Sequence, residues 1–301
     1  MSIEKPTEQP LVSIITVNYN QSEVTCQLIS SLQKITYKNI EIIVVDNGSP
    51  NDNPEKIKIR FPEVIFIKSI DNLGFAGGNN LGIKVAKGEY YFFLNNDTEV
   101  PENFLEPLIE FLSTSTNAGV VSPQIQYFYH PGTIQYAGYS PMSKYSIRNS
   151  GIGYKEINKG QYNSITETNY AHGAAMLVPR KVIEQVGMMP EIYFLYYEEY
   201  DWCEMIKQKG YKIYYIPQSL VFHKESVSTQ SDSPLKTYYL FRNRILWVRR
   251  NRKGIEKMMA MLYLLLVAFP KNYLSLISKG NWENSRELTN ALIWNLRNKK
   301  N

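Results

Sequence analysis

The N-terminal third of the chain alternates short apolar runs with helical periodicity, and no other feature restricts the possible folds as strongly. The apolar runs are Leu11–Val17, Ile40–Val45, Val64–Ile67 and Gly88–Leu94. Strands that alternate with helices form a mostly parallel sheet, because each helix returns the chain along a face of that sheet. We therefore predict an α/β fold with a twisted, Rossmann-like, mostly parallel sheet and helices on both faces.

Polar side chains follow the fourth apolar run directly. Asn95, Asn96 and Asp97 come at its carboxyl end, where such sheets bind their ligands. Asn95 and Asp97 both carry oxygen atoms and can share a divalent cation with a phosphate. The alternative is a helix cap, because Asn, Asp and Thr all cap helices and a helical pattern with Pro101 in its first turn follows.

Three other polar segments follow apolar runs and are expected at the same edge of the sheet. They are Thr16 to Asn20, Asp46–Asn47 and the glycine-rich turn Asp71 to Asn80. Glycines let a backbone approach a ligand closely, although tight turns need them equally. From about Val120 to Tyr170 the chain is rich in Tyr, Ser, Gly and Asn, and we expect irregular strands and loops that shape a substrate cleft.

The later part of the chain is also predicted to contain both helices and strands. Helices are expected over Val182–Val186 and Glu199–Lys209, and a strand over Tyr211–Ile216.

Cys26 and Cys203 lie far apart and suggest no disulfide framework, which favours a reducing compartment. The polar N-terminus shows no signal peptide, so a cytoplasmic location is expected.

Positive charge is concentrated at the C-terminal end. From Lys236 onward there are 14 Lys and Arg and 3 Asp and Glu, a net charge of about +11, whereas the remaining 19 basic and 25 acidic residues give about −6. A basic tail on an acidic body indicates an anionic surface or ligand. There is no nucleic-acid-binding signature, so an anionic membrane surface is the better match.

The tail from about Ser226 is expected to be helical, and Met258–Phe269 is almost wholly apolar. As a helix this run would extend about 20 Å, too short for a hydrocarbon core of about 30 Å, and Pro270 should interrupt it. Two alternatives stay open: a helix at the membrane interface, flanked by basic residues, or a helix packed on the body. The basic neighbours are Arg249, Arg250, Arg252, Lys253 and Lys257. The oligomeric state is not predicted.

Taken in order, several segments resemble the motifs of family 2 glycosyltransferases with the GT-A fold. VSIITVNYN, IIVVDNGS, NLGFAGGNNLG and FFLNNDTEVP resemble the donor half, and GAAMLVPR, YFLYYEEYDWC, GYKIYYIP and Phe222–His223 resemble the acceptor half. The resemblance covers about Leu11 to Lys224. It implies one catalytic domain over 10–225, with a donor half at about 10–100 and an acceptor half at about 101–225, and a helical C-terminal extension over 226–301.

The resemblance implies that the donor half binds a nucleoside diphosphate sugar. Asp46 would accept a hydrogen bond from uracil or thymine, although an Asp that begins a turn would look the same. Tyr19 would lie against the base, and Asn72 and Asn79 would contact the ribose and the sugar. The full set of implied donor residues is Thr16, Asn18, Tyr19, Asp46, Asn72, Gly74, Phe75, Gly78, Asn79, Asn95 and Asn96.

Asn95–Asn96–Asp97 occupies the place of the family's DXD metal motif, with an amide in the first position. The resemblance implies that Asp97 is the main ligand of Mg²⁺ or Mn²⁺, that Asn95 is a weaker ligand, and that His223 is a third one. A surface histidine after a strand is the alternative for His223.

The acidic cluster at Glu198 resembles the part of the family that carries the catalytic base. The resemblance implies Glu199 as the base, with Asp201 as the second candidate, whereas acidic residues also favour any helix N-terminus. Glu198, Trp202 and His172 are expected at the acceptor, although Trp202 would serve equally well in the core.

These expectations combine into an inverting, metal-dependent glycosyltransferase that acts on a glycan or lipid-linked acceptor. The motifs are most similar to bacterial enzymes of the rhamnosyltransferase and galactofuranosyltransferase branch, which use dTDP- or UDP-sugars in surface polysaccharide synthesis. Two alternatives remain. A sugar nucleotidyltransferase would carry Gly, Arg and Lys directly after the first strand, where this chain has Asn18 to Gln21. A non-catalytic binding relative would release no nucleoside diphosphate.

Overall fold

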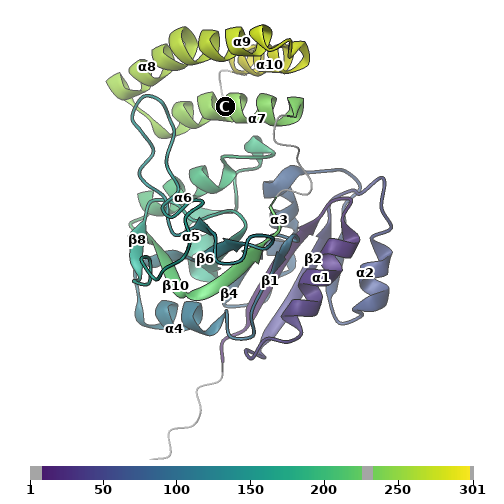
Figure 1. Cartoon of the computed structure of the whole chain (residues 1–301). Helices are drawn as coiled ribbons and strands as arrows, with labels where there is room; N and C mark the ends of the chain where they lie inside the picture. The colour runs from purple at the N-terminus through teal and green to yellow at the C-terminus, as the bar shows by residue number, and fades with distance from the viewer. Residues whose placement is uncertain (1–8, 226–232, 299–301) are drawn as a thin grey trace, which may run out of the picture.

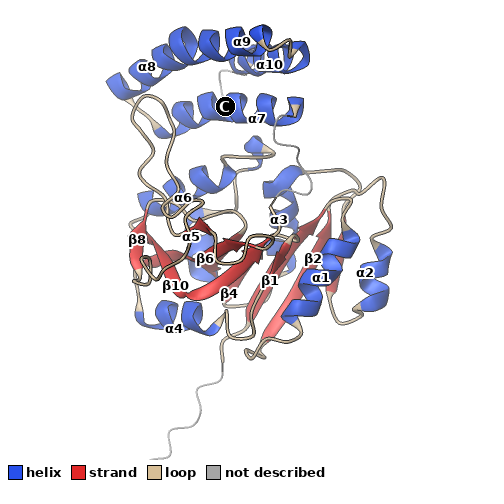
Figure 2. Ribbon diagram, viewed as in Figure 1, coloured by secondary structure: helices blue, strands red, loops and turns tan. Residues whose placement is uncertain are grey.

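A computed structural model describes residues 9–225 and 233–298, and these form one mixed sheet covered by helices on both faces, with further helices stacked above it (Figures 1 and 2). The sheet order is β3-β2-β1-β4-β9-β6-β10-β5. The first four strands are parallel, as predicted: β1 (Val12–Asn18), β2 (Ile40–Asp46), β3 (Ile65–Lys68) and β4 (Tyr90–Leu94). Asn18 pairs with Asp46, so these strands end at the same level.

Side chains of the central strands alternate between two cores. Phe92 of β4 points to one face and meets Phe104 with ring centroids 5.5 Å apart. Its neighbour Phe93 points to the other face and meets Trp202 edge to face at 5.4 Å. Because both faces are covered, β1 and β4 consist mainly of apolar residues, which makes them recognisable in the sequence. The helices that cover them are α1 (Ser22–Leu32), α2 (Glu55–Arg60), α3 (Gly74–Val85), α4 (Glu106–Thr114), α5 (Arg180–Val186) and α6 (Glu198–Gln208).

The second half of the sheet is more regular than the sequence indicated. The segment expected to be irregular begins with β6 (Ala118–Tyr127), a strand that is buried along its whole length. Its polar residues made the strand hard to recognise in the sequence, but their side chains form hydrogen bonds inside the protein. Ser122 Oγ donates to the Ala175 carbonyl at 2.7 Å, and Gln124 Nε2 donates to the Tyr215 hydroxyl at 2.8 Å. The other strands here are β5 (Thr98–Glu99), β7 (Ile134–Tyr136), β8 (Thr166–Thr168), β9 (Ala175–Pro179) and β10 (Lys212–His223).

The strand expected over Tyr211–Ile216 continues to His223, with an irregularity in register between Ile216 and Leu220. At its end, β10 pairs antiparallel with β5, so that His223 lies opposite Thr98. The helix expected around Pro101 does not begin there. Instead α4 begins at Glu106, and the two-residue strand β5 follows Asp97 directly. Asn95 to Asp97 therefore cap no helix, which removes that alternative.

The C-terminal region forms a helical layer above the sheet (Figure 1). Its members are α7 (Pro234–Asn251), α8 (Gly254–Tyr263), a π-helical segment η2 (Leu264–Ala268), α9 (Phe269–Ser278) and α10 (Trp282–Arg297). The expected start near Ser226 lies outside the described residues. Phe241, Ile245 and Trp247 of α7 are buried in the same core as Trp202, so α7 is packed firmly on the catalytic body.

Pro270 does not interrupt the apolar helix, contrary to the sequence expectation. Proline lacks an N–H, and its ring collides with a carbonyl of the preceding turn in a regular α-helix. Here the π-helical segment η2 lies immediately before it and provides a wider turn. As a result α8, η2 and α9 run together as one helix from Gly254 to Ser278, 25 residues long.

Candidate active site

A cavity of about 270 Å³ opens at the carboxyl ends of β1 and β4. One side is formed by the predicted donor half, and the other by the segment before α6. Among the predicted residues, the cavity is lined by Tyr19, Asn72, Gly74, Phe75, Asn79, Asn95, Asn96, Asp97 and His223. Residues to which the sequence assigned no site role also line it: Val17, Gln21, Asn47, Leu94, Phe194, Leu195, Tyr196 and Leu235.

The glycine-rich turn brings the two sides of the cavity together. Gly74 has φ +72°, and a Cβ atom on it would lie 2.1 Å from the carbonyl oxygen of Phe194. The next residue, Phe75, donates its N–H to that carbonyl at 2.7 Å. Asn72 Oδ1 accepts from the N–H of Gly74 at 2.9 Å and from Asn47 Nδ2 at 3.0 Å. Glycine is required at position 74 by both backbone conformation and space.

Four of the predicted donor-binding residues do not line the cavity but lie behind it: Thr16, Asn18, Asp46 and Gly78. Asp46 is fully buried, and its carboxylate accepts from Asn18 Nδ2 at 2.9 Å and from Ser49 Oγ at 2.6 Å. The turn-forming alternative therefore describes Asp46 in this structure, and its neighbour Asn47 reaches the cavity instead. Thr16 is fully buried in β1, and Gly78 packs against the side chain of Val17.

Asp97 and His223 form a buried pair at the base of the cavity, each only 6% exposed. His223 Nε2 lies 3.1 Å from Asp97 Oδ1, and its Nδ1 lies 2.7 Å from Gln135 Oε1. Burial alone would raise the pKa of Asp97, but the hydrogen bond to His223, the charges of His223 and Lys224 and a backbone hydrogen bond together outweigh burial and hold that pKa below its usual value. The residues are 126 positions apart in the chain and meet because β10 pairs with β5.

His172 and Gly173 connect this pair with Glu199. The rings of His172 and His223 meet edge to face with centroids 6.1 Å apart. A Cβ atom on Gly173 would lie 3.9 Å from the carboxyl carbon of Glu199 and 3.9 Å from the ring of Phe75, which lines the cavity. The Asp97–His223 pair therefore lies beside His172, and Glu199 lies beside the next residue, Gly173.

Glu199 is the acidic side chain whose properties suit a base. Its Oε2 is buried and has no hydrogen-bond partner among the described residues. Burial raises the pKa of Glu199 to about 7, and hydrogen bonds from nearby backbone groups compensate only in part. Burial, followed by the charge of Glu199, raises the pKa of Glu198 as well. A carboxyl group with a pKa near neutrality can accept a proton efficiently at physiological pH.

Burial of His172 lowers its pKa to about 3, and the nearby His223 adds to the effect. His172 is therefore neutral at physiological pH. Its Nδ1 accepts from the Ala174 N–H at 3.1 Å, which places the ring proton on Nε2. The ring also stacks on Tyr139, with centroids 6.0 Å apart. His172 therefore offers a fixed N–H donor between Asp97 and Glu199.

Two other predicted residues of α6 are structural. Asp201 is buried, and its carboxylate accepts from Arg250 Nε at 2.8 Å and from Asn251 Nδ2, both on α7. This pairing corrects its assignment as the second candidate base. Trp202 is fully buried and donates to the Gly187 carbonyl at 2.9 Å, so the core alternative describes it correctly.

The segment before α6 is held in an unusual backbone conformation. Phe194, Tyr196 and Tyr197 all have positive φ, at 64°, 68° and 75°. Left-handed conformations are unfavourable for bulky residues and persist only when their surroundings enforce them. Asn243 of α7 does so by donating to the carbonyls of Tyr193, Leu195 and Tyr196 at 3.1, 2.7 and 2.7 Å. Sequence analysis missed Phe194, Leu195 and Tyr196 because within YFLYYEEYDWC it assigned roles only to the acidic residues and Trp202.

The sequence is similar to those of known glycosyltransferases. The family model described as "Glycosyl transferase family 2" matches residues 13–187. The chain is 29% identical to the low-salt glycan biosynthesis hexosyltransferase Agl10 of Haloferax volcanii, over 78% of this chain and 74% of the relative. It is 38% identical to the Escherichia coli protein named UDP-Glc:alpha-D-GlcNAc-diphosphoundecaprenol beta-1,3-glucosyltransferase WfaP, over 35% of this chain and 42% of that one. An uncharacterized glycosyltransferase of Rickettsia typhi is 30% identical over 68% of this chain and 61% of its own length.

Solved structures agree on the fold. The mannosyltransferase PcManGT of Pyrobaculum calidifontis, in complex with GDP-Man and Mn²⁺, superposes with a TM-score of 0.58 at 16% identity, covering 96% of this chain and 81% of that one. GalNAc-T7 with UDP, GalNAc and Mn²⁺ gives a TM-score of 0.61 at 16% identity, covering 85% and 54%. Both sequence and fold lead to one assignment: the chain is a glycosyltransferase of the GT-A fold and belongs to glycosyltransferase family 2.

Proposed function

We propose that this glycosyltransferase is inverting and metal-dependent, and that it moves one sugar from a dTDP- or UDP-linked donor to a hydroxyl of a glycan or lipid-linked acceptor in surface polysaccharide assembly. One observation supports this most directly: the Asp97–His223 pair and Glu199 lie near each other beside one cavity. His172 contacts His223, and the adjacent Gly173 lies close to Glu199. A donor lying along Tyr19 and Asn72 would place its diphosphate near Asp97 and its sugar toward Glu199.

The residues at Asp97 fit a divalent cation. If the Nδ1–H of His223 donates to Gln135 Oε1, the Nε2 atom of His223 presents a lone pair toward Asp97 Oδ1, 3.1 Å away. Two acceptor atoms at that distance need a cation or a proton between them. Asn95 adds an amide oxygen at the cavity. Phosphate oxygens and water would complete the coordination of Mg²⁺ or Mn²⁺. When bound, such an ion would neutralise charge that develops on the diphosphate leaving group.

Glu199 would act on the acceptor. It would take the proton of the acceptor hydroxyl while that oxygen forms a bond to the anomeric carbon of the donor sugar. The bond from this carbon to the diphosphate oxygen would break on the opposite face, which inverts the configuration and needs no covalent intermediate. Burial of Glu199 supports this role, because a desolvated carboxylate with a pKa of about 7 is a stronger base than an exposed one.

A panel of nucleotide sugars tests the proposal. We expect dTDP- or UDP-sugars to raise the melting temperature of the full-length protein when Mn²⁺ is present, and to be hydrolysed slowly without an acceptor. Nucleoside diphosphate release is the measurement, because a binding relative would give the thermal shift alone and a nucleotidyltransferase would release pyrophosphate from a nucleoside triphosphate. Absence of release from every UDP-, dTDP- and GDP-sugar would contradict the proposal.

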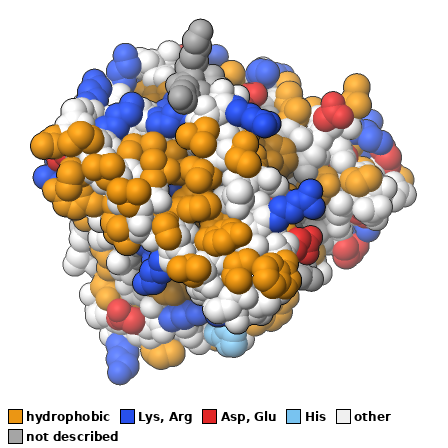
Figure 3. Space-filling view, turned by 90° about the horizontal axis from the view of Figure 1, so that it is seen from above, with side chains coloured by type: hydrophobic (Ala, Val, Ile, Leu, Met, Phe, Trp, Pro, Cys, Tyr) orange, Lys and Arg blue, Asp and Glu red, His pale blue; other side chains and the backbone are white. Residues whose placement is uncertain are grey.

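We further propose that the protein binds the inner face of a membrane peripherally. The helix Gly254–Ser278 has the length and composition to cross a membrane, a test that soluble core helices also pass, but only 17% of its apolar window is buried. Its buried residues Ala260, Leu264 and Ala268 form one stripe. Figure 3 shows apolar side chains gathered over the opposite, upper face. Exposed members are Ile255, Met258, Met259, Leu262, Leu266, Val267, Tyr273 and Leu274.

Part of the basic cluster expected beside this helix is turned toward the protein. Arg250 is in an ion pair with Asp201, and the guanidinium groups of Arg249 and Arg252, which keep their charge, contact Asn295 and the ring of Trp247. Apolar burial is therefore expected to contribute most of the membrane affinity, with charge as a secondary contribution.

A vesicle experiment checks this. Leu266→Glu should reduce sedimentation with vesicles of phosphatidylglycerol and phosphatidylcholine several-fold, because it puts a charge on the apolar face. Ile59→Glu is the matched control, because Ile59 is 78% exposed on α2 and Leu266 is 69% exposed. Equal sedimentation of the two variants would assign the face to another role.

A further inference from the structure

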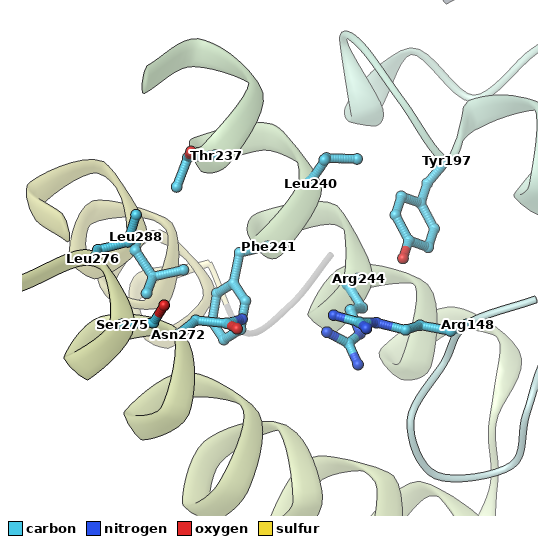
Figure 4. Close-up of a pocket in the computed structure, with 10 residues that line it drawn as sticks. All are labelled: Arg148, Tyr197, Thr237, Leu240, Phe241, Arg244, Asn272, Ser275, Leu276 and Leu288. Carbon is cyan, nitrogen blue, oxygen red and sulfur yellow. The ribbon is translucent and has the colours of Figure 1, made fainter. Parts of the chain in front are cut away.

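A second cavity, of about 330 Å³, lies between the catalytic body and the C-terminal helices. Tyr197, which immediately precedes α6, and Arg148 of the loop after β7 line it from the body. The remaining residues come from α7, α9 and α10: Thr237, Leu240, Phe241, Arg244, Asn272, Ser275, Leu276 and Leu288. Figure 4 shows the guanidinium groups of Arg148 and Arg244 close together at one end, with the Tyr197 hydroxyl pointing toward them.

Neither arginine has an acidic partner. Within residues 9–225 and 233–298, no ion pair includes Arg148 or Arg244. Arg244 is only 6% exposed and donates to the Ser146 carbonyl, a neutral acceptor, through Nε at 2.9 Å and through a terminal nitrogen. The Tyr263 hydroxyl is a second neutral neighbour. Arg148 is exposed, and its guanidinium group has no hydrogen bond with any residue that the structure describes.

This arrangement is costly without an anion. Burying a charged side chain is unfavourable unless an opposite charge compensates it, and two like charges side by side add repulsion. Burial and the neighbouring Arg148 both lower the pKa of Arg244. Paired guanidinium groups are the side chains that bind phosphate best, because each can donate two parallel hydrogen bonds. The cavity therefore presents a phosphate-binding end.

The rest of the cavity is suited to hydrocarbon. Leu240, Phe241, Leu276 and Leu288 line it, and Leu276 belongs to the long helix whose outer face is apolar. Tyr197 lies at the arginine end and connects the cavity with the active site, because it directly follows Phe194, Leu195 and Tyr196, which line the active-site cavity, and lies two residues before Glu199. An anion at the arginines would thus lie between Glu199 and the helices proposed to contact the membrane.

We propose that this cavity binds the phosphate or diphosphate of an acceptor in which that group joins the sugar to an apolar chain. The phosphate would contact Arg148 and Arg244, the chain would lie among the leucines, and the sugar hydroxyl would reach Glu199 past Tyr197. This inference rests on the proposed function, because it specifies the acceptor class of the same enzyme.

Farnesyl diphosphate is a suitable probe, because it carries a diphosphate on an apolar chain. Its binding to full-length protein is measured by calorimetry at low salt with EDTA, so that a metal ion at Asp97 cannot hold the diphosphate. Arg148→Gln should raise the Kd at least tenfold. Lys159→Gln is the matched control, because it removes one exposed positive charge from the same connection between β7 and β8 but outside the cavity, and its Kd should change less than twofold. Arg244→Lys should also weaken binding while keeping the charge.

Three results would overturn the inference. Arg148→Gln and Lys159→Gln could bind farnesyl diphosphate equally, or farnesol could bind as tightly as its diphosphate; either result removes the phosphate site. Equal affinity for dioctanoylphosphatidylglycerol would assign the arginines to a membrane headgroup instead of an acceptor.

The probe experiment is independent of sugar transfer. Arginine-dependent binding without any nucleoside diphosphate release from the nucleotide-sugar panel would contradict the proposed function, and with it the acceptor assignment, while the phosphate site itself would stand. Nucleoside diphosphate release with arginine-independent binding would overturn this inference alone.

Discussion

Glu199→Gln should lower the transfer rate by about 10³-fold and at the same time stabilise the protein above neutral pH. The rate falls because glutamine cannot accept the proton of the acceptor hydroxyl, and general-base catalysis typically contributes 10²- to 10⁴-fold. The fold is kept, because the two side chains have nearly the same shape. Initial rates with a dTDP- or UDP-sugar and Mn²⁺ measure the loss. Wild-type kcat/KM should rise with pH until Glu199 is deprotonated, around pH 7.

The stability change follows from the same raised pKa. The folded protein favours protonated Glu199, with a pKa of about 7 against an ordinary value of 4.5. The contribution of Glu199 to the free energy of unfolding of the wild-type protein is therefore fully present below about pH 4.5 and is lost as the pH rises toward 7. Glutamine does not ionise, so the variant should be more stable at pH 8 by a free energy of unfolding on the order of 3 kcal/mol, and equally stable at pH 4.

Glu204→Gln is the control for both measurements. Glu204 lies on the same helix, but its carboxylate binds Tyr170 and Lys207. Its variant should transfer sugar at nearly the wild-type rate and should not gain stability between pH 4 and pH 8. A Glu199→Gln enzyme with full turnover would refute the assignment of the base.

Asp97→Asn should remove the metal dependence and most of the activity. The change preserves size and leaves an amide oxygen near His223, so the buried pair is altered without opening a cavity. It removes the charge that a divalent cation requires, and we expect transfer to fall at least 10²-fold. The increase in melting temperature that Mn²⁺ produces with a nucleoside diphosphate should disappear, because the cation would lose its main protein ligand.

Glu99→Gln is the matched control for this variant. Glu99 also belongs to the turn and strand after β4, but its carboxylate pairs with Lys224 and does not line the cavity. Its variant should keep the Mn²⁺-dependent thermal shift. An Asp97→Asn protein that still responds to Mn²⁺ as the wild type does would show that the ion binds elsewhere.

Sequence patterns predicted the donor half of the fold well, because its strands consist mainly of apolar residues and alternate with helices. β6 was missed for the opposite reason: Ser122 and Gln124 are polar and buried, and their partners Ala175 and Tyr215 are far away in the sequence. The two-residue strand β5 has no periodicity to detect, yet it places Asp97 beside His223. Only the family resemblance indicated that pair.

The roles of individual acids could not be read from residue type. Asp46, Asp201 and Glu199 each follow a strand or begin a helix, and all three were plausible site residues. Hydrogen bonds from Asn18 and Ser49 occupy Asp46, and Arg250 pairs with Asp201. Glu199 keeps one carboxylate oxygen without a hydrogen-bond partner in the described part of the chain. These differences depend on side chains far away in the chain, which a local pattern does not contain.

Asn243 has a consequence for anyone who divides or recombines this enzyme. It lies beyond the last family motif, yet it carries the three hydrogen bonds that keep the Tyr193–Tyr196 carbonyls in place next to the catalytic helix. A protein truncated after residue 225 would retain every motif and lose this support. Chimaeras made by exchanging tails between relatives should therefore be joined after Asn251, so that α7 always travels with its own catalytic body.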